Sequence, residues 1–195
     1  MQKQSIFEVP LYICEVENHQ DQKQKLITYI DEYFEKDIQS LNLENVSQTT
    51  ERNLHVVNWF NDLVMYIGSK CPQLHVDFNI SNHRSIGVSA MWATRCQSNI
   101  RIDEEVYGAN FLYGAYFLQT PANSGNLRIK NLTTDRNYFN KISPTKANTV
   151  NTDVFETAVP EGNMILFPSH IIPKYTTNAS VDTRYIIHFL LDIIE

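Results

Sequence analysis

The sequence lacks the features that mark several large classes of protein. Its three cysteines, Cys14, Cys71 and Cys96, are odd in number and far apart, which argues against both a disulfide framework and a zinc site. No apolar run approaches the roughly 20 residues that span a bilayer. The formal charge is −6 and the basic residues are scattered, unlike the basic stripe of a nucleic-acid-binding protein. We therefore expect neither a membrane nor a nucleic acid as a partner.

Familiar catalytic motifs are also absent. The chain has no Gly-rich phosphate loop, no Gly-x-Ser-x-Gly elbow and no His-Glu-x-x-His helix, and its cysteines have no histidine partner that the sequence identifies. Residues 1–5 lead directly into a strand-like segment at 6–10. We therefore expect that the chain has no signal peptide. We also expect that it is synthesised in a reducing cytoplasm.

What the sequence does contain is a composition suited to a folded domain. Hydrophobic residues make up 43% of the chain and charged residues 19%, which argues against disorder. Residues 6–16 are typical of an edge strand. Apolar residues at spacings of three and four predict amphipathic helices over 21–36 and 51–68. The second helix should begin at Thr50-Glu51 and end where Gly68 and Pro72 follow.

From Ser85 onward the pattern changes to short strands. Helices followed by strands predict an α+β fold, mainly β, in which two helices pack on one of two facing antiparallel sheets. The length suits a single domain over 1–195, with an edge strand and helices in 1–72 and the β core in 85–195. β-branched and aromatic residues, separated by turn clusters, predict strands over 85–96, 110–119, 125–131, 153–158, 162–167, 171–177 and 183–193.

Histidines and one aspartate offer a candidate metal site. His75 and Asp77 have the H-x-D spacing that places two ligands on one face of a strand. His170 or His188 would supply the distal imidazole of a 2-His-1-carboxylate set. In the alternative interpretation none of these residues binds a metal. The sequence places His75 in a loop-like stretch and predicts that His170 lies at a rim. It predicts that His188 lies in the core or in a cavity. His188 is four residues from Arg184 in a strand of period two, so both should lie on one face.

Motifs along nearly the whole chain resemble those of the 2-oxoglutarate/Fe(II) oxygenases that marine bacteria and their tailed phages encode. Residues 162–169, Gly-Asn-Met-Ile-Leu-Phe-Pro-Ser, are similar to that family's G-x-L-x-L-F-P-S strand. Shorter similarities occur in the same order at 6–11, 92–94, 110–118 and 124–129. The resemblance implies a double-stranded β-helix of jelly-roll or cupin-like form, with Fe(II) and 2-oxoglutarate as the cofactors of active members.

The resemblance also implies where the family's ligands should fall. The His-x-His pair aligns with Glu105 and Tyr107, and the distal histidine aligns with Pro173. Arg184 stands at the arginine that pairs with the 2-oxoglutarate carboxylate, and Ile186 replaces the serine after it. Iron sites of this kind need converging imidazoles and a carboxylate, and proline has no donor side chain. We therefore expect a degenerate site with no catalytic residue, no metal and no cofactor, in which Arg184 is vestigial.

Two functional classes follow. The first is a pseudoenzyme, a binding or structural module such as a tailed-phage virion or assembly component, inferred by analogy with the family. The second is an active Fe(II)/2-oxoglutarate-dependent hydroxylase that uses the alternative histidine and aspartate ligands. For the module we expect other protein chains, including virion proteins, as partners. They would contact the polar loops 97–109 and 132–152 or the edge strand 6–16.

Overall fold

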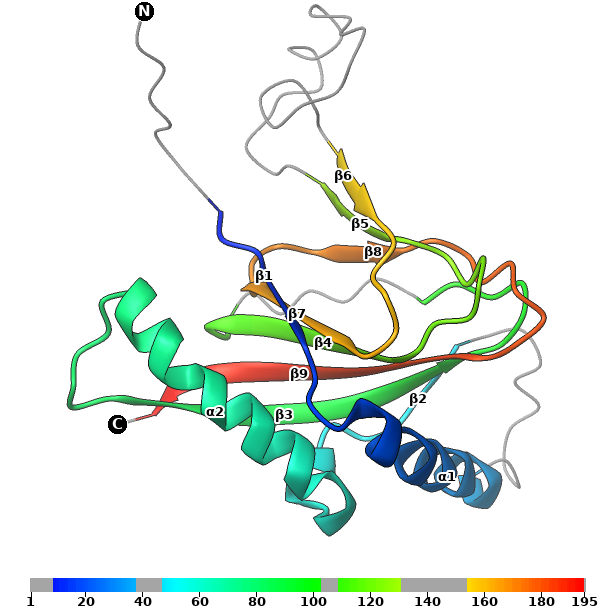
Figure 1. Cartoon of the computed structure of the whole chain (residues 1–195), viewed down its shortest axis with the longest axis horizontal. Helices are drawn as coiled ribbons and strands as arrows, with labels where there is room; N and C mark the ends of the chain where they lie inside the picture. Colours follow the sequence, from blue (N-terminus) through cyan, green and yellow to red (C-terminus); the bar gives the residue numbers. More distant parts are fainter. Residues whose placement is uncertain (1–8, 38–46, 103–108, 131–153, 195) are drawn as a thin grey trace, which may run out of the picture.

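The computed structural model describes residues 9–37, 47–102, 109–130 and 154–194. Two antiparallel sheets face each other, and two helices cover the outer face of the larger sheet (Figure 1). The larger sheet has the strand order β1-β7-β4-β9-β3-β2, and the smaller sheet has the order β6-β5-β8. The predicted α+β, mainly β, architecture is confirmed.

The elements have the following bounds. The helical elements are α1 (His19–Asp37), the short 3-10 helices η2 (Leu54–Val56) and η3 (Asn58–Phe60), and α2 (Asn61–Asp77). The strands of the larger sheet are β1 (Tyr12–Glu15), β2 (Gln48–Thr49), β3 (Ser85–Cys96), β4 (Leu112–Gln119), β7 (Asn163–Pro168) and β9 (Arg184–Ile194). Those of the smaller sheet are β5 (Leu127–Lys130), β6 (Val154–Thr157) and β8 (Pro173–Tyr175). None of the described helices is long and apolar enough to cross a membrane.

Strand β9 lies in the middle of the larger sheet and positions most of the interior. It pairs with β3 on one side and β4 on the other, so that His188 is opposite both Trp92 and Ala115. Residues 184–191 are all buried. Alternate side chains face opposite ways along a strand, so Tyr185, Ile187 and Phe189 pack with the helices while Ile186 and Leu190 face the smaller sheet. The molecule therefore has two hydrophobic layers separated by the larger sheet.

Each long helix attaches to the larger sheet through an apolar stripe. Burying a Leu, Ile or Phe side chain stabilises the fold by about 1.5–3 kcal/mol relative to leaving it exposed. The helix predicted over 21–36 is confirmed as α1. The buried side chains are Leu26, Ile27, Ile30 and Phe34 of α1, and Leu63, Ile67, Cys71 and Leu74 of α2.

The second helix begins later than the sequence predicts. It was expected from residue 51, yet α2 begins at Asn61. The reason is a tertiary contact: the Thr50 amide N–H donates to the Ala93 carbonyl at 3.0 Å, and the Ala93 amide donates to Thr50 Oγ1 at 3.0 Å. Thr50 therefore extends the sheet edge where a helix start was expected, and η2 and η3 bring the chain round to α2.

The same helix also ends later than expected. Gly68 and Pro72 both lie inside α2, which continues to Asp77. An internal proline costs about 3 kcal/mol or more, but stopping at residue 68 would leave Cys71 and Leu74 without the burial that they have in the structure. This packing outweighs the local cost. His75 and Asp77 consequently lie in the last turn of a helix, and the expectation of a loop-like stretch there was wrong.

Candidate functional site between the two sheets

The space between the two sheets is lined by inward-facing side chains of both. Strands β3, β4, β7 and β9 contribute one wall and strands β5 and β8 the other, as the layers in Figure 1 show. The side chains from these strands include Trp92, Tyr113, Phe117, Phe167, Ile186 and Leu190 on the larger sheet, and Leu127 and Tyr175 on the smaller. Two polar side chains, Arg184 and His188, are buried in the same layer. As predicted, they lie on one face of β9.

His188 is held by aromatic side chains. Its ring stacks on Trp92 with 5.4 Å between centroids, and Nδ1 is hydrogen-bonded to the Tyr113 hydroxyl at 2.5 Å. That hydroxyl is 2.9 Å from the hydroxyl of Tyr175. Burial, followed by the charges of Arg184 and Arg52, lowers the pKa of His188 from 6.5 to about 3. The imidazole is therefore neutral at physiological pH, and its buried Nε2 has no hydrogen-bond partner in the described part of the chain.

Arg184 lies on the same face of β9 as His188 and close to Tyr175. One of its terminal nitrogens donates to the main-chain carbonyls of Ser124 at 2.5 Å and Thr176 at 3.2 Å. The other lies 3.7 Å from Cys96 Sγ. The guanidinium carbon is 5.7 Å from the Tyr175 ring centroid. The side chain is 1% exposed; two carbonyl dipoles of the fold stabilise its charge, while its buried Nε has no hydrogen-bond partner among the described residues.

The other candidate residues lie at separate places in the fold or outside the described residues. Pro173 is buried in β8, where the resemblance puts the distal histidine. Glu105 and Tyr107 lie outside the described residues, as does the loop 132–152. His75 is half-buried and Asp77 exposed on α2, and His170 is exposed in the turn after β7. His188 alone among the candidate histidines faces the interior.

The described residues do not supply a donor set for an iron ion. Within the ranges 9–37, 47–102, 109–130 and 154–194, no group of three or more His, Cys, Asp or Glu side chains is arranged to hold a metal. This includes the alternative set of His75, Asp77 and His170 or His188. A 2-His-1-carboxylate site requires such a convergence. The neutral imidazole of His188 and the phenols of Tyr113 and Tyr175 are hydrogen-bonded to one another. They include no second imidazole and no carboxylate for Fe(II).

The cluster around His188 contains residues that were not predicted as part of a site. Trp92, Tyr113 and Tyr175 come from β3, β4 and β8, and local patterns do not show which positions of separate strands meet. A partial signal exists in β9, where Arg184 and His188 lie four residues apart on one face of a mostly apolar strand. Buried polar groups at such positions need partners; the Tyr113 hydroxyl supplies one for His188, and main-chain carbonyls supply those of Arg184.

Solved structures support the fold at low sequence identity. A prolyl-4-hydroxylase from Pseudomonas putida matches with a TM-score of 0.61 and 7% identity, over 93% of this chain and 92% of that one. A non-heme α-ketoglutarate-dependent carbocyclase, SnoK, from nogalamycin biosynthesis matches with a TM-score of 0.65 and 8% identity, over 93% and 78%. HygX from Streptomyces hygroscopicus, with nickel and 2-oxoglutarate bound, has a TM-score of 0.59 and 7% identity, over 94% and 83%. The predicted double-stranded β-helix is thereby confirmed.

The family is shown by the sequence. No curated protein matches the chain. A family model described as "Putative 2OG-Fe(II) oxygenase" matches residues 90–189, which include β3 from residue 90, the strands of the smaller sheet and the inward-facing Arg184 and His188 of β9. This match covers more than half of the 195 residues, and the chain therefore belongs to the 2OG-Fe(II) oxygenase family that the model describes.

Proposed function

We propose that this chain is a non-catalytic member of its family that serves as a binding or structural module. The observation that carries the proposal is the cluster of Trp92, Tyr113, Tyr175 and His188 between the sheets. Aromatic rings occupy the interior there, and the described residues offer no metal-ligand set beside them. Chemistry that depends on a bound iron needs a convergent ligand set, and the part of the chain that the structure describes supplies none beside this cluster.

The contacts of Arg184 also support the proposal. An arginine that recognises a carboxylate presents two parallel N–H groups to it. Here one terminal nitrogen of Arg184 already donates to two main-chain carbonyls, and the other faces a thiol. The guanidinium thereby ties β9 to the segments around Ser124 and Thr176. Its role in this proposal is structural.

A module of this kind acts through its surface, and the edge strand β1 is the surface that we propose. Strand β1 is at the end of the larger sheet, where β7 is its one partner strand among the described residues. Ile13 of β1 is 55% exposed, and Val9, which precedes the strand, is 52% exposed. Edge strands present unpaired backbone groups to which a partner strand adds. The proposed partner is another protein chain, and the family's phage members motivate the narrower proposal that the assembly is a virion.

The first test is metal binding and turnover. The full chain is incubated anaerobically with Fe(II) and 2-oxoglutarate and freed of unbound metal by gel filtration; its iron is then measured by elemental analysis. We expect iron well below one atom per chain and no succinate when oxygen is admitted. Stoichiometric iron that is lost in a Glu105→Ala variant would show that the proposal is wrong.

The surface proposal has a separate test. Hydrogen exchange of the β1 amides is compared between the isolated protein and the native complex or particle. Slower exchange at residues 12–15 in the complex is the expected result. Equal exchange rates in both would exclude β1 as the contact, whatever the outcome of the metal experiment.

A further inference from the structure

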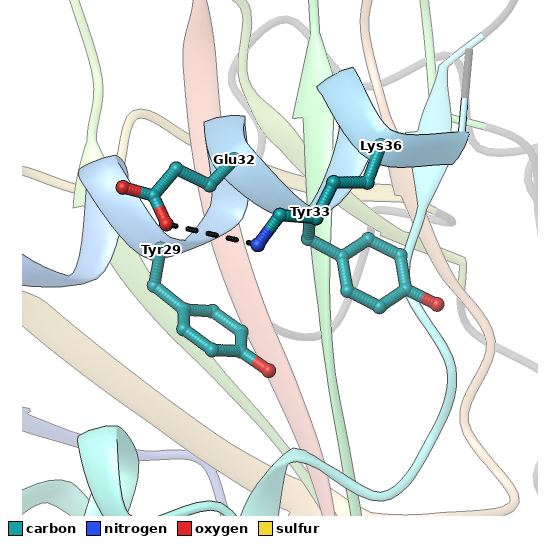
Figure 2. A pocket seen from close by; sticks show the side chains of 4 residues that line it. All are labelled: Tyr29, Glu32, Tyr33 and Lys36. Carbon is teal, nitrogen blue, oxygen red and sulfur yellow. Dashed lines mark ion pairs between the residues drawn. The ribbon is translucent and has the colours of Figure 1, made fainter. Parts of the chain in front are cut away.

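A recess on the exposed side of α1 combines aromatic faces with a charged pair. It is lined by Tyr29, Glu32, Tyr33 and Lys36 and has a volume of about 310 Å³. These residues follow one another at spacings of three, one and three, so they share one face of the helix. Figure 2 shows both tyrosine rings projecting from the same side of α1, with the Glu32–Lys36 ion pair beside them. The volume is at the lower end of the range of small-molecule sites.

The aromatic part of the recess is rigidly supported. Tyr29 packs edge-on against the buried Phe60, with ring centroids 5.3 Å apart. The hydroxyl of Tyr33 accepts a hydrogen bond from the Glu51 amide at 3.3 Å. Both rings are half-buried, so each leaves part of its surface open. The ring of Trp59, 41% exposed and 5.8 Å from that of Tyr29, extends the aromatic surface beyond the recess.

The polar part of the recess both accepts and donates hydrogen bonds. Glu32 Oε2 and Lys36 Nζ are 4.0 Å apart, and their side chains are 56% and 81% exposed. An exposed pair at this distance is weak, so either group can turn to a ligand at little cost. The two charges cancel locally, which favours a neutral ligand over a phosphate or an ammonium ion. A ligand rich in hydroxyl groups matches a carboxylate acceptor beside an ammonium donor.

We propose that this recess is a binding site for a neutral saccharide. A pyranose ring has an apolar face of C–H groups that complements the negative face of an aromatic ring, and its edge carries hydroxyls that both donate and accept. Tyr29 and Tyr33 supply the ring faces, and Glu32 and Lys36 supply the partners for the hydroxyls. The site depends on no metal and lies on the outside of α1, away from the space between the sheets.

The test uses intrinsic fluorescence and two neutral probes, the trimers of glucose and of N-acetylglucosamine. The chain has two tryptophans: Trp92 is 1% exposed, whereas Trp59 is exposed beside the recess. A saturable emission change that disappears in a Trp59→Phe variant therefore reports binding at this face. We expect such a change with at least one trimer, and the same affinity with and without EDTA.

Variants locate the site. Lys36→Met should weaken binding about two- to tenfold, the effect of losing one hydrogen bond. Glu32→Gln should weaken it by a similar factor, because a neutral amide oxygen is a weaker acceptor than a carboxylate. Tyr33→Leu keeps apolar bulk without a ring face and should weaken it at least as much. The control is Glu35→Gln, an exposed position of α1 outside the recess, which should bind as the wild type does. Circular dichroism verifies that each variant is folded.

Three outcomes would overturn the proposal. These are the absence of saturable binding by either trimer, binding that Tyr33→Leu and Glu32→Gln leave unchanged, and binding of a proline-rich peptide in place of both sugars. The last would assign the recess to a peptide, since aromatic grooves also bind extended proline segments. Because saccharide titration in EDTA involves no iron, its failure leaves the metal test of the proposed function unaffected.

Discussion

The imidazole of His188 lies nearly parallel to the indole of Trp92, with 5.4 Å between the ring centroids and 17° between the ring planes. The two residues are direct partners across β3 and β9. The guanidinium of Arg52 lies 4.8 Å from the centroid of the same indole. Burial, followed by the charges of Arg184 and Arg52, lowers the pKa of His188 and keeps the imidazole neutral, and this has a measurable consequence for stability.

Replacing His188 by leucine should flatten the pH dependence of folding. The pKa of His188 is about 3 in the folded chain, against an ordinary value of 6.5. Between these values the unfolded chain binds a proton that the folded chain does not, so the free energy of unfolding falls as the pH is lowered from 6.5 towards 3. Urea unfolding at several pH values in this window should give a steeper fall for the wild type than for His188→Leu. Parallel curves would contradict the neutral, buried imidazole.

Two glycines in different surroundings provide a matched pair of alanine substitutions. A Cβ on Gly114 would lie 2.1 Å from Cζ of Phe189, whereas a Cβ on Gly68 would meet nothing within 4 Å. Gly114→Ala should destabilise the protein by about 1–3 kcal/mol through overpacking. Gly68→Ala should stabilise it by about 0.5–1 kcal/mol, because alanine costs less backbone entropy in a helix. Urea midpoints of both variants at neutral pH check the opposite signs.

The strand half of the fold was predictable because its signals are local. The segment 85–96 was predicted and observed with the same bounds, since β-branched and aromatic residues there are bounded by turn residues. Period two correctly placed Arg184 and His188 on one face. The start of α2 was not predictable, because Thr50 forms tertiary hydrogen bonds to Ala93 that no local pattern shows.

The candidate site was predictable only in part. The resemblance indicated the position of Arg184, but the carbonyls that it contacts come from segments 60 and 8 residues away. Tyr113 and Tyr175 reach His188 from two other strands. Such meetings depend on the register between strands, which a single sequence does not fix. Glu105 and Tyr107 lie outside the described residues.

Glu161→Gln should loosen the attachment of α1 to the sheet at neutral pH. Burial alone raises the pKa of Glu161, but hydrogen bonds from Lys23, the Thr120 amide and His19 lower it overall. Its stabilisation is therefore present above the ordinary pKa of 4.5 and is lost as the pH falls through the lower folded value. We expect a loss of about 1 kcal/mol at pH 7, discounted for partial exposure.

The control for this loss is Glu17→Gln. Glu17 forms an exposed pair with Lys70 at 3.9 Å, and such pairs contribute about 0–1 kcal/mol. In chemical denaturation, Glu161→Gln should have a lower free energy of unfolding than Glu17→Gln at neutral pH. At acid pH the two variants should be similarly stable. A Glu161→Gln variant as stable as wild type at neutral pH would show that the contact with Lys23 is dispensable.

Arg184→Met should destabilise the folded protein even when no 2-oxoglutarate is present. Its guanidinium donates to the carbonyls of Ser124 and Thr176 and packs on Gly125, where a Cβ would come within 2.8 Å of the terminal nitrogen. Methionine fills a similar volume but leaves these acceptors unpaired, which costs about 1–3 kcal/mol for each buried group. Thermal unfolding should show a large fall in Tm.

The matched control for Arg184 is Arg128→Met. Arg128 forms a half-exposed pair with Glu156 at 2.9 Å, and its loss should cost about 1 kcal/mol or less. If Arg184 instead served to bind a carboxylate ligand, 2-oxoglutarate with Mn(II) would raise the Tm of the wild type by mass action, and Arg184→Met would abolish that rise while changing the ligand-free Tm little. We expect the reverse pattern, namely no ligand-dependent rise and a low ligand-free Tm in Arg184→Met, because one terminal nitrogen of the guanidinium already donates to two main-chain carbonyls of the fold.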